Sequence, residues 1–125
     1  MTRAERTIAV VDDESSVRVA LGRLLRLAGY TVQAYASGEE FLASLERRVP
    51  DCAVLDVHLP GLSGFEVERR LRETHPDLAI VFITANDEAG LTQTALGAGG
   101  ARLLRKPFSN DALLEAVTAA LENSA

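Results

Sequence analysis

The amino-acid sequence predicts an α/β fold in which helices cover a parallel β-sheet. Strand-like apolar runs alternate with helix-like segments along the chain, a pattern typical of this class. Four of the runs have the composition of strands that are buried on both faces. They cover residues 8–11, 52–55, 80–83 and the shorter 103–104. With 125 residues the chain has the size of one domain, so we expect a single domain over residues 1–125 with an ordered core over about 6–121.

The first predicted helix follows the strand at residues 8–11. Ser15 or Ser16 can cap its N-terminus, and Gly29 ends it. Between these limits the apolar residues fall on one face, as expected for a helix that packs on a sheet. They are Val17, Leu21, Leu24, Leu25 and Ala28.

The next segment is predicted to form a strand at residues 31–35, and its mixed polar and apolar character suggests an edge position in the sheet. Ser37 begins the second helix, which we expect to run to about residue 47. Glu40 stands three residues after Ser37 and completes a capping box.

The third predicted helix follows Gly64 and ends before Pro76, which cannot continue a helix. Val67 and Leu71 are expected to point inward. The charged residues of this helix are predicted to point mostly outward. They are Glu66, Glu68, Arg69, Arg70 and Arg72.

The last two predicted helices differ in strength. The segment at about residues 89–96 contains Gly90, and an interior glycine costs about 1 kcal/mol relative to alanine, so we expect a short and mobile helix there. Ser109 caps the last helix, which has a clear apolar face. That face contains Leu113, Val117 and Leu121.

The composition limits the classes of function. A chain that is 47% hydrophobic and 25% charged is an ordinary globular protein, and a net charge of −5 argues against nonspecific nucleic-acid binding by this chain. No apolar stretch approaches the roughly 20 residues of a membrane helix, and the N-terminus lacks a signal-peptide core. We therefore expect a cytoplasmic protein without membrane contacts. The single cysteine, Cys52, lies in an apolar run and is expected to be a buried, inert thiol.

The most informative feature is the residues at which the buried runs end. Asp12 and Asp13 follow the first run, Asp56 follows the second, Thr84 follows the third, and Lys106 comes shortly after the fourth. If the strands are parallel, these side chains converge at the carboxyl edge of the sheet, where open α/β sheets bind their ligands. Three carboxylates, a hydroxyl and an ammonium group can together hold a divalent cation and a phosphoryl group.

The motifs around these residues resemble the receiver domain of two-component response regulators, nearly from end to end. The matching pieces are VVDDE at residues 10–14, LDVHLPG at 55–61, ITA at 83–85 and KPF at 106–108. Each piece alone is weak, but all four occur in order and at matching spacing. The resemblance implies a doubly wound, flavodoxin-like receiver fold with five parallel strands in the order 2-1-3-4-5 and five helices.

The resemblance also implies roles for the residues at the sheet edge. Asp56 would be the phospho-acceptor and would take a phosphoryl group from a histidine kinase, a phosphotransfer protein or a small acyl phosphate, in a reaction that needs Mg²⁺. Asp13 and Asp56 would bind Mg²⁺ directly, Asp12 directly or through water, and His58 through its backbone carbonyl. These ligand oxygens suit Mg²⁺.

The remaining roles concern the phosphoryl group and the switch. Lys106 would hold one phosphoryl oxygen, Thr84 would donate to another, and Ala85 would leave room for the donor. Receivers usually carry Tyr or Phe at the position of Leu103, and this aromatic residue turns inward when the threonine moves to the phosphate. Leu103 lacks the aromatic bulk, so we expect this conformational readout to differ here. Ser63 stands where the family often has Asp or Asn, which we expect to be a small change in the loop after Asp56.

Simpler interpretations exist for each residue taken singly. Asp12 and Glu14 could merely complement the dipole of the first helix, Asp56 could be a turn residue at a strand end, and Lys106 could be a solvated surface charge. They fail jointly, because three acids buried at one edge would be costly without a cation.

Two other functions remain as alternatives. A small haloacid-dehalogenase-type phosphatase also uses a strand-end Asp as its nucleophile. That family carries an Asp-x-Asp motif at the nucleophile, whereas Asp56 is followed by Val57 and His58. A receiver-like interaction module that signals without phosphate is favoured only by Leu103.

The predicted function is therefore a phosphorylation-controlled switch that catalyses only its own phosphorylation and dephosphorylation and is not a conventional enzyme. The predicted fourth helix, fifth strand and fifth helix would carry the contact with a partner, an output domain or a second copy in a homodimer. We expect no output domain within these residues. A LuxR-type DNA-binding domain in a longer protein and a chain that acts alone both remain open.

Overall fold

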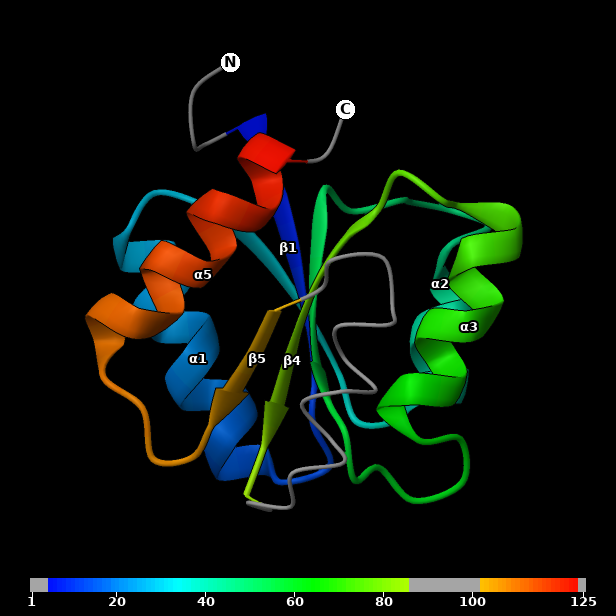
Figure 1. Cartoon of the computed structure of the whole chain (residues 1–125), viewed down its shortest axis with the longest axis horizontal. Helices are drawn as coiled ribbons and strands as arrows, with labels where there is room; N and C mark the ends of the chain where they lie inside the picture. Colours follow the sequence, from blue (N-terminus) through cyan, green and yellow to red (C-terminus); the bar gives the residue numbers. More distant parts are fainter. Residues whose placement is uncertain (1–4, 86–101, 124–125) are drawn as a thin grey trace.

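A computed structural model of the chain describes residues 5–85 and 102–123. Its centre is a sheet of five parallel strands in the order β2-β1-β3-β4-β5 (Figure 1). The strands are β1 Thr7–Val11, β2 Thr31–Tyr35, β3 Cys52–Asp56, β4 Ala79–Thr84 and β5 Arg102–Arg105. This order confirms the predicted topology and the predicted edge position of β2.

Helices cover both faces of the sheet, with α1 and α5 on one face and α2 and α3 on the other (Figure 1). Their bounds are α1 Ser15–Leu27, α2 Gly38–Ser44, α3 Gly64–Thr74 and α5 Asn110–Asn123. Within residues 5–85 and 102–123 there are four helices, one fewer than the five that the sequence predicts. The predicted helix at residues 89–96 lies outside the described residues.

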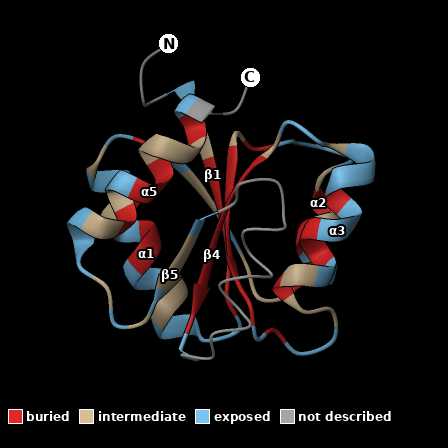
Figure 2. Ribbon diagram, in the orientation of Figure 1, coloured by how far each residue is buried: buried red, intermediate tan, exposed pale blue. Residues whose placement is uncertain are grey.

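The core consists of two apolar clusters, one on each face of the sheet. Alternate residues of each central strand belong to alternate clusters, because successive side chains of a strand point to opposite faces. In β1, Ile8 and Val10 pack beneath α1 and α5, whereas Ala9 and Val11 pack beneath α2 and α3. Burial is concentrated along β1, β3 and β4 (Figure 2), as their unbroken apolar runs predict. The prediction that the run at residues 103–104 is buried on both faces is wrong, because β5 is an edge strand and both leucines are only partly buried.

The helix caps partly differ from the prediction. Helix α1 begins at Ser15 itself, its N-cap residue is Glu14, and no side chain caps it. Neither Ser15 nor Ser16 is therefore the cap. The reason is local, because Asp12 Oδ1 accepts the Glu14 N–H at 2.9 Å and thereby sets where the chain enters the helix.

The capping box predicted for α2 is only half formed. Ser37 Oγ accepts the Glu40 N–H at 3.1 Å, but the Glu40 carboxylate accepts from Ala36 N and not from Ser37. Helix α2 also ends at Ser44, before the predicted residue 47. A complete capping box instead starts α3, where Ser63 and Glu66 bond each other's backbone N–H groups.

One charged residue of α3 is buried, contrary to the prediction from the sequence. The sequence predicts that Glu68 points outward, but this residue is 6% exposed. The Arg72 Nε donates to Glu68 Oε2 at 2.6 Å, one helical turn away, and this bond compensates the buried carboxylate.

Three further local predictions, at Gly29, Ser109 and Cys52, are confirmed. Gly29 ends α1 with φ 104°, a value that favours glycine, and Ser109 Oγ accepts the Ala112 N–H at the start of α5. Cys52 is buried in β3. No helix in the described part of the chain is long and apolar enough to cross a membrane.

Candidate functional site

The predicted site forms at the carboxyl edge of the sheet, where β1 and β3 end side by side. Asp12 directly follows β1 and Asp56 is the last residue of β3; the two strands are paired in register at Val11 and Leu55. Both aspartates continue the alternation of the residues that pack under α1 and α5, so their side chains turn toward the same face.

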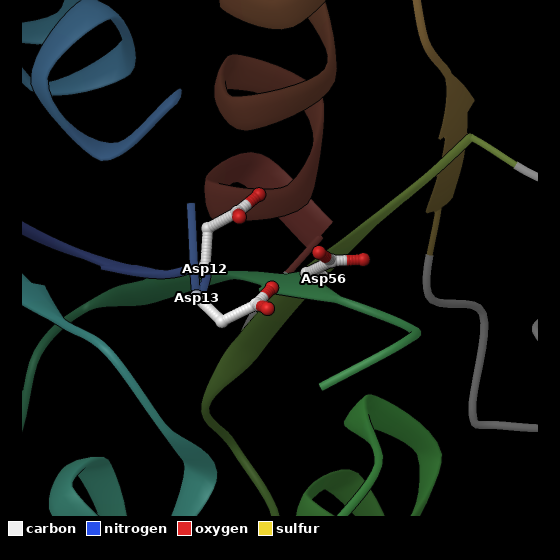
Figure 3. A group of neighbouring side chains, drawn as sticks. All are labelled: Asp12, Asp13 and Asp56. Atoms are coloured by element: carbon white, nitrogen blue, oxygen red, sulfur yellow. The ribbon is translucent and has the colours of Figure 1, made fainter. Parts of the chain in front are cut away.

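Three carboxylates meet at this edge (Figure 3). Asp12, Asp13 and Asp56 each bring one oxygen into a group whose members all lie within 4.8 Å of one another. Asp12 and Asp56 are buried, with exposed fractions of 0% and 5%, whereas Asp13 is exposed. The cluster thus combines two fixed carboxylates with one that faces solvent.

Lys106 reaches the cluster from the last strand. Its Nζ donates to Asp12 Oδ2 at 3.1 Å and lies 3.6 Å from Asp56 Oδ2. The residue comes just after β5, and its backbone N–H donates to the Thr84 carbonyl at 2.7 Å, which fixes the start of this segment against the end of β4. One ammonium group is therefore shared between two buried carboxylates.

Backbone groups orient both buried aspartates. Asp56 Oδ1 accepts the His58 N–H at 3.1 Å, so a tight turn after β3 holds one carboxylate oxygen. Asp12 Oδ1 accepts the Glu14 N–H, and its Oδ2 accepts from Lys106. The carboxylates thus have set directions before any ligand binds.

Arg18 is a residue of this region that the sequence analysis missed. Its Nη1 donates to the backbone carbonyl of Asp12 at 2.7 Å. The only signal in the sequence is a basic residue one turn into the helix that follows the acid pair, and exposed helices often carry such residues.

Burial and charge shift the pKa values at the site. The pKa of Asp56 is raised, mainly by burial and further by the charges of Asp12 and Asp13, although the His58 N–H and Lys106 oppose this. Partial burial favours the neutral form of Lys106, but its hydrogen bond to Asp12 and the neighbouring carboxylates outweigh this and raise its pKa. The site therefore keeps a charged lysine beside carboxylates that repel one another.

This residue set fits a divalent cation. Three carboxylate oxygens in close range carry more negative charge than the single Lys106 ammonium compensates. Hard cations such as Mg²⁺ take oxygen ligands, usually one or two carboxylates together with waters. The acidic pocket of Asp12, Asp13 and Asp56 is thus consistent with Mg²⁺.

The other predicted residues lie around this cluster. Thr84 is buried at the end of β4, and Ala85 and His58 are exposed on the loops that follow β4 and β3. Leu103 lies apart from the carboxylates. It is half-buried on β5, pairs with Phe82 in the sheet register and packs on the cluster beneath α2 and α3.

Comparisons with known proteins agree with this geometry. The family model of the response regulator receiver domain matches residues 8–118. Response regulator MprA of Mycobacterium ulcerans is 42% identical over 117 residues, which cover 94% of this chain and 50% of that protein. The chain spans about half the length of the curated relatives it matches.

Solved structures show the same fold. A response regulator receiver protein from Burkholderia phymatum is 44% identical, with a TM-score of 0.84 and coverage of 97% of this chain and 98% of that one. The BeF3-activated DrrB receiver domain is 30% identical, with a TM-score of 0.85 and coverage of 94% and 98%.

Proposed function

The chain belongs to the response regulator receiver family, and we propose that Asp56 is its phospho-acceptor. It is the receiver domain of a two-component response regulator, and such domains are generally signalling switches rather than catalysts. Such domains interact with histidine kinases or phosphotransfer proteins. The observation that carries the proposal is the cluster of Asp12, Asp13 and Asp56 with Lys106 at the sheet edge.

Asp56 is suited to act as the nucleophile. Its Oδ1 is held by the His58 N–H and its Oδ2 lies near Lys106, so the carboxylate has a fixed direction within the cluster. In the proposed reaction a carboxylate oxygen of Asp56 forms a bond to phosphorus. The bond between phosphorus and the donor's imidazole nitrogen or acyl oxygen breaks, and the electron pair leaves with the donor. Positioning and charge neutralisation are what such a transfer needs from the protein.

Charge neutralisation is the difficulty at this site, because a phosphoryl dianion must approach three carboxylates. We propose that Asp13 and Asp56 hold Mg²⁺ directly, that Asp12 does so directly or through water, and that the His58 carbonyl supplies a further oxygen. Bound Mg²⁺ supplies positive charge that offsets this repulsion.

The remaining residues receive the phosphoryl group in this proposal. Lys106 gives up part of its pairing with Asp12 and Asp56 and holds a phosphoryl oxygen as a point charge. Thr84 donates its hydroxyl to another oxygen, and the small, exposed Ala85 leaves room for the donor.

Phosphorylation can be tested by intact-mass measurement with acetyl phosphate as the donor. We expect the wild-type chain to gain one phosphoryl group with Mg²⁺ and none with EDTA, and the Asp56→Asn variant to gain none. A matched control is Asp77→Asn, which removes an exposed acid that precedes β4. This acid lies at the opposite end of β4 from Thr84, so the substitution should leave phosphorylation unchanged. If Asp56→Asn were phosphorylated as readily as wild type, the assignment would be wrong.

The same experiment separates the proposal from the phosphate-independent interaction module, for which the wild-type chain would gain no mass. Two further proposals rest on the family alone. One is that the protein is located in the cytoplasm. The other is that the predicted fourth helix, β5 and α5 contact a partner, an output domain or a second copy. The fourth helix lies outside the described residues. A LuxR-type output domain in a longer protein stays a prediction that the comparisons do not specify.

A further inference from the structure

We propose that Arg18 is a positioning residue for the metal site, because it fixes the peptide group that joins Asp12 to Asp13. This inference rests on the proposed function, since it assumes that these two carboxylates bind a cation. Its basis is the hydrogen bond of 2.7 Å from Arg18 Nη1 to the Asp12 carbonyl oxygen.

The bonded carbonyl is the one that matters for Asp13. The Asp12 carbonyl, the Asp13 N–H and the Asp13 Cα belong to one planar peptide unit, so fixing the oxygen restricts the position of the Asp13 Cα. Asp12 is buried and its carboxylate is held by Glu14 N–H and Lys106. Asp13 is exposed, so packing does not hold its side chain and its direction depends on the backbone.

The other attachments of this segment do not replace Arg18. The Asp12 N–H donates to the Tyr35 carbonyl at 3.2 Å, which ties the start of the segment to the neighbouring strand. The Glu14 N–H is tied to the Asp12 side chain. Arg18 is the group that reaches from α1 to the peptide between these two points, and a guanidinium donor gives a strong, directional bond.

Arg18 can be substituted without opening a cavity in the core. The residue is only half-buried, and it lines a surface groove between α1 and β2 together with Val19, Arg23 and Ala34. A shorter side chain here leaves its space to solvent. Arg23 is an exposed arginine of the same helix, so it provides a control with the same loss of charge.

The sign of the electrostatic effect sharpens the test. Removing the positive charge of Arg18 by itself favours binding of a cation to the nearby carboxylates. A loss of Mg²⁺ affinity in Arg18→Gln must therefore come from the altered position of the ligands.

The test is a calorimetric titration of the chain with Mg²⁺ alone, without a phosphoryl donor. We expect the dissociation constant of Arg18→Gln to rise about tenfold, at the low end of what the loss of groups that orient metal ligands costs. Arg23→Gln should stay within about twofold of wild type, and Arg18→Lys, which keeps the charge but not the planar fork, should lie between. Urea denaturation without Mg²⁺ checks that each variant is folded.

Different results would contradict the role of Arg18 and the metal site itself. If wild type binds Mg²⁺ and Arg18→Gln binds it equally well, the Arg18 inference is wrong and the metal site stands. The Arg18 inference is equally wrong if Arg23→Gln loses as much affinity as Arg18→Gln. Where Arg18→Gln does not fold, wild-type affinity in Arg18→Lys is the contradicting result. A wild-type chain that binds no Mg²⁺ contradicts the metal site itself and the inference with it.

Discussion

The three carboxylates differ in burial and in their hydrogen bonds, and this difference predicts which of them can reorient toward a cation. Asp12 and Asp56 are buried and oriented by hydrogen bonds, whereas Asp13 is exposed and lies in the cluster only through its position in the chain. An exposed carboxylate can turn toward a cation without breaking a buried bond. Asp13 is therefore the proposed ligand whose removal should harm the fold least.

We expect Asp13→Ala to lose most of the stabilisation that Mg²⁺ gives to the wild-type chain. A ligand at ten times its dissociation constant stabilises a protein by about 1.4 kcal/mol. Without metal the variant should be at least as stable as wild type, because one repelling charge is gone. Thermal unfolding with and without Mg²⁺ measures both effects.

The control is Glu14→Ala, which removes the same charge from the next, also exposed, residue. It should keep the Mg²⁺ response. An unchanged Mg²⁺ response in Asp13→Ala would remove Asp13 from the set of ligands.

Cys52 gives a second prediction for a single residue. Burial, with a smaller effect from Asp51, raises the pKa of its thiol from 9.0 to about 12. The thiolate is the reactive form, so the folded chain should not react with a disulfide reagent such as DTNB at pH 8, while the chain in denaturant should react at once. Because the folded pKa is the higher one, stability from this group is complete below pH 9 and is lost as the pH rises toward 12. Fast reaction in the native state would contradict the burial of this thiol.

Among the helices and strands, the start of α3 is the feature that the sequence analysis undervalued. Ser63 caps the helix that follows the Asp56 loop, and Glu66 returns a bond to the Ser63 backbone. Gly64 lies so close behind the Asp56 carbonyl and Val57 that a Cβ there would collide with the backbone. The cap and this close approach together fix the loop that leads away from the proposed phospho-acceptor.

We predict that Ser63→Ala lowers the free energy of unfolding by about 1 kcal/mol, the usual cost of losing a serine cap. Hydrogen bonds from the Ser63 backbone N–H and from its side chain lower the pKa of Glu66, and Ser63→Ala keeps the first and loses the second. The contribution of the side-chain bond is present at pH values above the ordinary pKa of Glu66 and is lost as the pH falls through its folded pKa. The difference between wild type and Ser63→Ala should therefore shrink in acid. Urea denaturation at about pH 7 and about pH 3 measures it, and a difference that grows in acid would contradict this account.

In the molecule as a whole, the two edges of the sheet differ from its centre. β3 and β4 are buried along their whole length, whereas β5 is short, half-exposed and at the edge next to the proposed site. Segments of low local stability are where switching motions are expected. We therefore expect the conformational change on phosphorylation to affect β5 and not the central strands of the sheet.

Hydrogen exchange with and without beryllofluoride, a phosphoryl mimic, tests this expectation. We predict changes in β5, in α5 and in residues 85–100, whose sequence has weak helix signals and which lie almost entirely outside the described part of the chain. Strands β1 and β3 should stay unchanged apart from their ends. Since Leu103 replaces the usual aromatic residue, the shift should be modest, and changes confined to α1 would contradict the prediction.

The amino-acid sequence was enough to predict the fold class, the buried central strands β1, β3 and β4, the cap at Ser109 and the set of acids at the strand ends. These features follow from residues close together in the chain, such as an apolar run that stops at Asp12 or Asp56. The strand order came with the family resemblance, and the sheet confirms it.

How the groups at the sheet edge meet depends instead on the packed fold. The bond between Lys106 and Asp12 joins residues 94 positions apart, and it exists because β5, β4, β3 and β1 lie side by side in one sheet. The burial of Glu68, the entry of α1 without a serine cap, and the contact of Arg18 with the Asp12 carbonyl were likewise not readable from the sequence. Periodicity along a chain reports which face a residue occupies, whereas these contacts depend on which other element packs against that face.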